Sequence, residues 1–288
     1  MNRRSIEGQG ERVYRSHRAA PRRLRLGSLL APCLALLAAS CQNFNLYSVD
    51  QDIELGTQAF AEVTQSEAIL TSGPQVEQVQ RVTNRLTASA LDLHPEIAPL
   101  FEWEVVVIDD PATVNAFCLP GGKMAVYTGI LPVAGSDAGL AVVMGHEIAH
   151  ATERHGTERL TRNGLMGTAT QVLLEHEDHQ QIAAVLGNLG IGMPWGRTDE
   201  LEADHEGLMI MANAGYDPRE APAFWERMQA LASGGGGNSG GSSGNAILAA
   251  DSIDEFFSTH PSNQNRIEAL RAALTEALPL YEAARGGK

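Results

Sequence analysis

Apolar positions recur every three or four residues in two segments near the start of the folded region. These segments, residues 51–70 and 75–92, each predict an amphipathic helix. Residues 101–109, FEWEVVVID, alternate in part and are rich in β-branched side chains, which predicts a strand. Residues 114–129 predict two short strands around the turn Pro120–Gly122.

The pattern becomes mostly helical after this turn. A strongly apolar stretch predicts one long helix from about Asp137 to Leu160, and another helix covers about 199–214 and stops at Gly215. Residues 165–188 and 217–232 also predict helices, residues 233–245 predict a flexible Gly/Ser loop, and a last helix follows this loop. We therefore expect a single α+β domain over residues 51–288, mostly helical, with a small sheet beside the long helix.

Charge is distributed very unevenly along the chain. Residues 1–27 carry eight Arg against Glu7 and Glu11, residues 28–40 carry no charge, and the net charge of −14 leaves −20 for the remainder. Such an acidic body binds nucleic acid poorly, so we expect no nucleic-acid partner.

The basic start and the apolar run after it have the layout of an export signal, and the run is too short to cross a membrane comfortably. Its end, Ala38-Ala39-Ser40-Cys41, resembles the bacterial lipobox. The resemblance implies a signal peptide over residues 1–40, a lipid on Cys41 and a tether over residues 41–50. Gln42, where Asp would imply retention at the inner membrane, implies a location on the periplasmic side of the outer membrane. The alternative is an ordinary secretory signal and a soluble periplasmic protein.

The segment GHEIAH, residues 145–150, has the spacing of a metal site. His146 and His150 lie on one face of a helix and can hold one ion between their imidazoles. Glu147 lies about 100° around the helix, where it can reach a water that the ion activates and take its proton. The surrounding residues are too apolar for a solvent-exposed face, and buried His and Glu need partners. The segment therefore predicts a catalytic metal site.

A third protein ligand cannot be taken from the residues directly after this segment. His155 is nine residues from His146 and, on a continuous helix, faces the opposite way. The metzincin pattern fails because Glu153 and Gly156 stand where it requires Gly and His. A thermolysin-like pattern lacks its acid near position 170, and the nearest alternatives are Glu175 and Glu177.

A second candidate segment is GRTDELEADHEGL, residues 196–208. Glu200 and Asp204 lie one helical turn apart, so Glu200 can bind the ion while Asp204 orients a ligand histidine. Glu202 points about 200° away from Glu200 and is a poor competitor. Spacing alone also leaves open a solvated acidic helix.

Several linked motifs resemble one zinc metallopeptidase family, which includes the CAAX prenyl proteases, HtpX, the Oma-type mitochondrial proteases and the periplasmic BepA and LoiP proteases. The resemblance covers roughly residues 50–285. The matching segments are VNAFCLPGGKMAVYTGIL, GHEIAHATERHG, GRTDELEAD, AGYDPREAPAFWERM and STHPSNQNRI. It implies one zinc ion per chain, bound by His146, His150 and Glu200, in a lipoprotein-type periplasmic member of the family.

The resemblance also assigns roles outside the zinc ligands. It implies that Asn115, Ala116 and Phe117 form an edge strand that borders the cleft and binds an extended peptide substrate. His260 would face the cleft, where it either donates to the oxyanion or occupies the open zinc position in a resting state. A surface position for His260 is the alternative. Arg197 and Arg266 are candidates to pair with cleft carboxylates.

We therefore predict a zinc-dependent endopeptidase of the bacterial cell envelope, anchored to the membrane by lipid. The resemblance implies misfolded or misassembled envelope proteins as substrates. One alternative is a lipoprotein chaperone or assembly factor of the same fold, against which the intact Glu147 argues. Another is a structural zinc protein, which three ligands and an open position disfavour. The sequence does not specify the oligomeric state.

Overall fold

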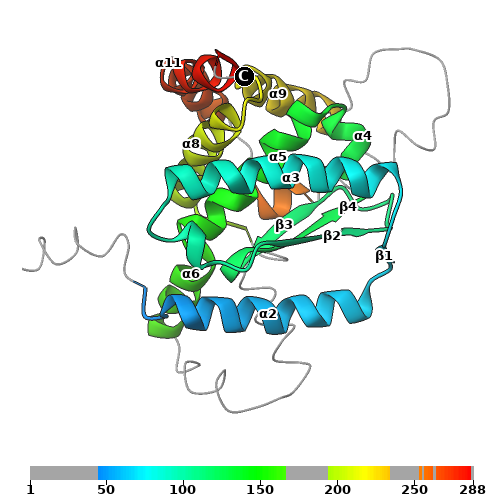
Figure 1. Cartoon of the computed structure of the whole chain (residues 1–288), viewed down its shortest axis with the longest axis vertical. Coiled ribbons are helices and arrows are strands. Elements are labelled where there is room, and N and C mark those ends of the chain that lie inside the picture. The colour runs from blue at the N-terminus through cyan, green and yellow to red at the C-terminus, as the bar shows by residue number, and fades with distance from the viewer. Residues whose placement is uncertain (1–44, 167–193, 234–252, 255, 262–263, 287–288) are drawn as a thin grey trace, which may run out of the picture. The chain divides into compact units, whose positions relative to one another are not determined.

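A four-stranded sheet with helices on both faces organises the residues that the computed structural model describes, 45–166, 194–233, 253–254, 256–261 and 264–286 (Figure 1). The strand order is β1-β2-β4-β3. Strand β2 pairs in parallel with β4, whereas β1 and β3 pair antiparallel with β2 and β4. The strands are β1 (Ile69–Leu70), β2 (Glu104–Ile108), β3 (Ala116–Leu119) and β4 (Lys123–Tyr127).

Helices form the rest of the described regular structure, together with two short 3₁₀ turns, η1 (Ala98–Leu100) before β2 and η2 (Pro120–Gly122) between β3 and β4. The helices before the candidate site are α2 (Val49–Ser66), α3 (Pro74–Leu93) and α4 (Ile130–Ala134). The others are α5 (Asp137–Thr152), α6 (His155–Met166), α8 (Arg197–Asn213), α9 (Glu220–Ala232) and α11 (Gln264–Gly286). The prediction of a mostly helical α+β fold with a small sheet is confirmed.

The two faces of the sheet pack against different helices, as Figure 1 shows for α2 on one side and α3 on the other. Alternate strand residues make this possible because neighbouring side chains point to opposite faces. Ile108 and Phe117 pack with Phe60 of α2, whereas Val107 and Cys118 belong to the larger core that contains α3 and α5.

Helix α5, which carries the segment GHEIAH, is buried along almost its whole length. It begins where the side chain of Ser136 accepts a hydrogen bond from the backbone N–H of Gly139, and every residue from Gly139 to Thr152 is buried. Leu140, Met144 and Ile148 form the predicted buried stripe and are 0% exposed. A helix that is apolar on all sides is stable only inside a core, and this core is made by the sheet, α3 and α8.

The predicted long helix from Asp137 to Leu160 is wrong because the chain turns after Thr152. Arg154 adopts a left-handed backbone conformation with φ of 59°, and α6 starts afresh at His155. The side chain of Arg154 binds the carboxylate of Asp52, with Nε 2.5 Å from Oδ2, and its Nη2 donates to the carbonyl oxygen of Tyr47. These long-range contacts hold a conformation that local helix propensity disfavours.

The first predicted helix is also shorter than expected. Helix α2 ends at Ser66, and Ile69 and Leu70 instead extend along β2, opposite Ile108 and Val107. Pairing with the sheet therefore overrides the helical periodicity at this end.

Most of two other predicted segments lies outside the described residues. These are the predicted helix over 165–188, apart from its first two residues, and most of the predicted loop over 233–245. Within the described part of the chain, none of the helices is both long and apolar enough to span a membrane.

Helices α5 and α8 approach so closely that their backbones touch at two glycines. A Cβ atom on Gly207 would lie 2.7 Å from the backbone nitrogen of His146 and 2.8 Å from the carbonyl carbon of Gly145. A Cβ atom on Gly145 would lie 2.9 Å from the carbonyl oxygen of Gly207. These are backbone contacts, so a larger residue can fit only if the two helices separate.

We predict that Gly207→Ala separates α5 from α8 and thereby moves the side chains that these helices present to each other. The expected result is a loss of about 1–3 kcal/mol in unfolding free energy, the usual range for overpacking a core. Chemical denaturation measures it. Gly286→Ala is the control, because a Cβ atom there would meet nothing within 4 Å. Equal stability of both variants and the wild type would contradict the role of the glycine contact.

Candidate functional site

Helix α5 carries His146, Glu147 and His150 into the interior. The two histidines are separated by one helical turn and both are buried, and Glu147 is 2% exposed. The ring centroids of His146 and His150 lie 4.6 Å apart, with the rings almost perpendicular. The local prediction that both imidazoles share one face of the helix is confirmed by this geometry.

Helix α8 brings Glu200 and Asp204 to the same place. Glu200 lies in the first turn of the helix and Asp204 one turn later, and both are buried. Because Gly207 allows α8 to lie directly against α5, these carboxylates reach the histidines of α5. The solvated acidic helix that spacing alone left open is therefore excluded for this face of α8.

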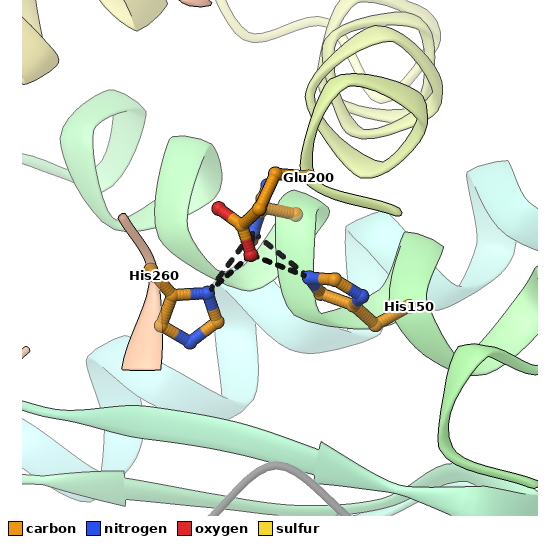
Figure 2. A group of neighbouring side chains, drawn as sticks. His150, Glu200 and His260 are labelled. Atoms are coloured by element: carbon orange, nitrogen blue, oxygen red, sulfur yellow. Dashed lines mark hydrogen bonds and ion pairs between the residues drawn. The ribbon is translucent and has the colours of Figure 1, made fainter. Parts of the chain in front are cut away.

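Within the described part of the chain, four donor residues from three segments converge on one point: His146, His150, Glu200 and His260. Figure 2 shows His150 and His260 pointing toward the carboxylate of Glu200. Nε2 of His146 is 3.1 Å from Nε2 of His150 and 3.3 Å from Nδ1 of His260. Oε1 of Glu200 is 3.1 Å from Nδ1 of His260 and 3.5 Å from Nε2 of His150.

This spacing fits a tetrahedral metal site. With zinc–nitrogen bonds of about 2.0 Å, the donor atoms of a tetrahedron are about 3.3 Å apart. The longest of these donor–donor separations, 3.8 Å, joins His146 Nε2 to Glu200 Oε1. Three imidazole nitrogens that face one another at such distances cannot all carry protons, so their lone pairs are available to a cation.

The charges around this point also fit a dication. Among the described residues, the group contains the buried carboxylates of Glu147, Glu200 and Asp204 and the buried guanidinium of Arg266. With neutral histidines, three carboxylates against one guanidinium leave a formal charge of −2. Uncompensated buried charge is unfavourable, and one Zn²⁺ would neutralise it.

The protonation states of two of the donors, His150 and Glu200, also favour metal binding. Burial holds the pKa of His150 well below its ordinary value, which leaves the imidazole neutral. Burial would raise the pKa of Glu200, but His260 and Arg266 outweigh it and hold this pKa well below its usual range. A neutral imidazole and an ionised carboxylate are the forms that bind metals.

The pKa of His146 reflects the negative charge of the surrounding carboxylates. Burial works to lower its pKa, but the hydrogen bonds and charges of Asp204 and Glu200 outweigh burial and raise the pKa to about 9. Nδ1 of His146 lies 3.1 Å from Oδ1 of Asp204, so this carboxylate orients the ring from the side opposite the donor cluster.

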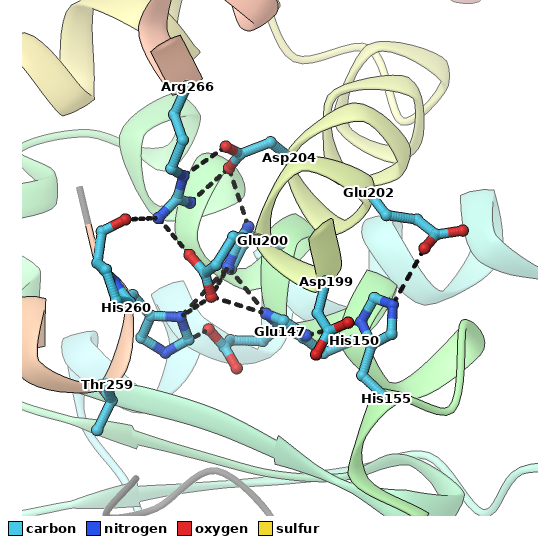
Figure 3. A network of polar contacts seen from close by, with 12 residues as sticks. Glu147, His150, His155, Asp199, Glu200, Glu202, Asp204, Thr259, His260 and Arg266 are labelled. Atoms are coloured by element: carbon cyan, nitrogen blue, oxygen red, sulfur yellow. Dashed lines mark hydrogen bonds and ion pairs between the residues drawn. The ribbon is translucent and has the colours of Figure 1, made fainter. Parts of the chain in front are cut away.

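Arg266 of α11 ties the two carboxylates of α8 together (Figure 3). Its Nε and Nη2 donate to the oxygens of Asp204 at 2.6 and 2.7 Å, and its Nη1 pairs with Glu200. Its guanidinium also lies 4.2 Å from the ring centroid of Trp225. The expected pairing with a site carboxylate is therefore observed for Arg266, whereas Arg197 lies exposed on the surface.

His260 is buried at 2% exposure, so the alternative of a surface position is wrong. Its Nδ1 belongs to the donor cluster, and its Nε2 lies 3.5 Å from Oε1 of Glu147. Burial raises the pKa of Glu147. Among the described residues, no hydrogen bond reaches Oε1 of this glutamate.

The predicted edge strand also lies at the site. Strand β3 is the last strand in the sheet order, and the backbone of Cys118 is hydrogen-bonded to Glu147. Ala116 and Phe117 are in β3, and Asn115 precedes it, with its carbonyl oxygen accepting from the backbone of Tyr127. The outer edge of β3 and the carboxylate of Glu147 are therefore neighbours.

The prediction that His155 faces away from the site is wrong. Because the helix turns at Arg154, the His155 ring folds back against His150, with its Nδ1 2.9 Å from Nδ1 of His150. Glu202 lies 3.4 Å from the other side of the His155 ring, so it contacts the site indirectly rather than competing with Glu200. The prediction assumed a continuous helix, and the sequence contains no local signal of this turn.

Trp195 is a further site residue that the sequence did not indicate. Its indole stacks on the ring of His150, with centroids 4.4 Å apart and planes 18° apart, and its backbone N–H donates to the carbonyl oxygen of Thr259. A cavity of about 10 Å³ lies beside His150 and Trp195, roughly the volume of one water. The donor cluster is thus closed to solvent in this arrangement.

The structure does not describe three of the residues that the sequence analysis singled out. Cys41, predicted to carry a lipid, and Glu175 and Glu177, the alternative ligands, lie outside the described residues.

A separate group, His94, Glu153 and Glu206, brings one histidine and two carboxylates together near the end of α5. Its nitrogen–oxygen distances of 3.7 and 3.8 Å involve different nitrogens of His94. These two contacts therefore do not place both carboxylates around one nitrogen of His94.

Comparison with known proteins finds relatives that are metallopeptidases. The chain is 38% identical over 188 residues to the mitochondrial metalloendopeptidase OMA1 of Arabidopsis thaliana, covering 65% of this chain and 35% of the relative. It is 35% identical over 242 residues to the Schizosaccharomyces pombe protein of the same name, covering 82% and 65%. The Yersinia pestis beta-barrel assembly-enhancing protease is 25% identical over 192 residues, covering 63% and 38%. The chain spans between about a third and two thirds of the length of the first curated relatives it matches.

These relatives contradict the predicted location on the periplasmic side of the outer membrane. Six relatives at 30–38% identity carry mitochondrial names, and the lipoprotein type of the family finds no support. A basic segment followed by a short apolar run belongs to a kind of leader that resembles several targeting signals, so it could not by itself establish the compartment.

The family itself is established by a match over most of the folded region. Residues 74–274 fit the model of peptidase family M48, and this range contains both histidines of α5, the acidic pair of α8 and His260. The prediction of a metallopeptidase of this kind is confirmed at the level of the family. The chain belongs to peptidase family M48.

Proposed function

We propose that the chain is a zinc metalloendopeptidase that holds one zinc ion with His146, His150 and Glu200. The observation that carries this proposal is the buried convergence of their donor atoms at 3.1–3.8 Å around a group of net negative charge. Membership of peptidase family M48 supports the same reaction class.

Zinc bound there would polarise the peptide carbonyl and make the attacking water more acidic. Glu147 is the residue that would accept a proton from the attacking water. Its buried carboxylate has a raised pKa, which makes it a stronger base than an exposed glutamate and able to pass the proton to the leaving amine. Asp204 holds the ring of His146 in the orientation that keeps Nε2 directed at the cluster.

His260 serves as a latch in this proposal. Its Nδ1 is close to both His146 and Glu200, at the corner of the tetrahedron that an open catalytic site would leave free. Trp195 and Thr259, joined by a backbone hydrogen bond, lie beside it. Withdrawal of His260 would make this corner available and would also free Oε1 of Glu147, which it faces at 3.5 Å.

The proposed substrates are misfolded or misassembled proteins. Strand β3 is at the edge of the sheet next to Glu147, and an extended peptide can pair with such an edge through its backbone alone. Asn115, Ala116 and Phe117 are the residues proposed to guide it. Folded proteins rarely offer a free extended segment of this kind, whereas misfolded ones do.

The ligand assignment predicts that His146→Ala and Glu200→Ala each lose zinc. Each change removes one of the proposed donors, and catalytic zinc sites use three protein ligands. Metal analysis of the purified variants measures the zinc-to-protein ratio. His205→Ala, a change at a half-exposed histidine on the same α8 helix, should keep one zinc per chain. Full zinc content in either ligand variant would refute its assignment.

The proposed general base predicts that Glu147→Gln keeps zinc and loses proteolysis. The amide has the same shape but cannot take a proton, so the rate should fall by about 10²–10⁴-fold. Casein hydrolysis at matched zinc content is the measurement. An unchanged turnover number would remove Glu147 from the mechanism.

The latch predicts that His260→Ala is more active than the wild type and still binds zinc through the three remaining ligands. Casein hydrolysis per bound zinc, together with a search for self-cleavage within residues 233–245, tests this. A fall of about 10²–10³-fold with zinc retained would instead indicate that His260 stabilises the oxyanion. An unchanged rate would reject both roles.

A further inference from the structure

His150 presents its two ring nitrogens to different partners. Nε2 faces the donor cluster, 3.1 Å from Nε2 of His146, while Nδ1 on the other side of the ring lies 2.9 Å from Nδ1 of His155. A nitrogen that binds a metal carries no proton, so a neutral His150 has its proton on Nδ1. That N–H therefore donates to Nδ1 of His155.

This assignment determines the proton of the next ring as well. If Nδ1 of His155 accepts a hydrogen bond, the proton of the neutral ring is on Nε2. Nε2 of His155 faces Oε2 of Glu202 at 3.4 Å, and this carboxylate is the acceptor (Figure 3). The three residues thus form a directed chain from His150 through His155 to Glu202.

We propose that His155 and Glu202 are positioning residues that hold His150 in the tautomer and orientation needed to bind zinc. This inference rests on the proposed role of His150 as a zinc ligand. It gives His150 the support that Asp204 supplies directly to His146. Trp195 stacked on the face of the His150 ring and His155 at its edge restrain the ring in two directions.

The backbone is built to place His155 there. The left-handed conformation of Arg154 reverses the chain between α5 and α6, and contacts with Asp52 and Tyr47 hold Arg154 in place. His155 is consequently buried at 2% exposure, five residues after a ligand that it could not reach on a continuous helix. His155 is not a member of the donor cluster, because it contacts the opposite nitrogen of His150.

The experiment measures zinc affinity by chelator competition and the visible absorption spectrum of the Co²⁺-substituted protein. His155→Phe keeps a flat ring but offers no acceptor, so we expect zinc affinity to fall by about 10–100-fold, with a shifted Co²⁺ spectrum. In His155→Gln the amide oxygen can accept from His150, and this variant should recover most of the loss. Glu202→Gln should weaken zinc binding by several-fold.

Glu206→Gln is the matched control, because it removes the same charge from the same helix and has no contact with His155 in the described hydrogen bonds. It should bind zinc like the wild type. Wild-type affinity and an unchanged Co²⁺ spectrum in His155→Phe would overturn the proposal, and so would equal losses in Glu202→Gln and Glu206→Gln. If His155→Phe does not fold, Glu202→Gln and His155→Gln decide by the same criteria.

A separate variant distinguishes failure of this inference from failure of the proposed function. His150→Ala should lose zinc if His150 is a ligand. Full zinc content in His150→Ala would refute the proposed site itself, whereas loss of zinc there with normal binding in the His155 and Glu202 variants would refute only the positioning role.

Discussion

The backbone contact between α5 and α8 is the constraint on which the rest of the site depends. Gly145 and Gly207 let the helices meet without intervening side chains, so the histidines of one reach the carboxylates of the other. The same closeness buries three carboxylates with a single guanidinium among the described residues. The architecture therefore creates a negative charge that it does not itself neutralise, and donor atoms spaced for a tetrahedral cation lie within it.

The two histidines of α5 are supported in unequal ways. His146 faces the buried carboxylate of Asp204, which needs Arg266 as its counter-charge. His150 faces a neutral imidazole, and the carboxylate beyond it, Glu202, is 41% exposed. A direct carboxylate partner for His150 would have added another negative charge to the interior. An intervening histidine provides the orientation while the charge stays in contact with water, where it is less costly.

Closure of the site and the proposed chemistry make opposite demands. Burial removes water from around the donors and sets the protonation of His150 and Glu200, but a peptide substrate needs access to the same point. Trp195 and His260 cover the cluster from segments joined through the backbone hydrogen bond between Trp195 and Thr259. Movement of these covering groups is a smaller change than movement of α5, which is held in the core on all sides.

Sequence alone determined what depends on neighbours within one turn of a helix. The i, i+4 spacing placed His146 and His150 on one face, with Glu147 beside them, and the same rule paired Glu200 with Asp204. Local pattern also predicted the buried stripe of α5 and the strands β2, β3 and β4, but not β1. Resemblance, rather than spacing, joined the two helices into one proposed site, because spacing left a solvated acidic helix equally open.

Tertiary structure decided everything that depends on contacts between distant residues. Arg154 leaves the helical conformation because Asp52 and Tyr47, about a hundred residues earlier, bind its side chain, and this turn delivers His155 to His150. Ile69 and Leu70 become a strand because β2 offers them partners. Helical periodicity reports only which side of a segment is apolar. It contains no information about a long-range ion pair or a free sheet edge, and these interactions outweigh the small local preferences of a few residues.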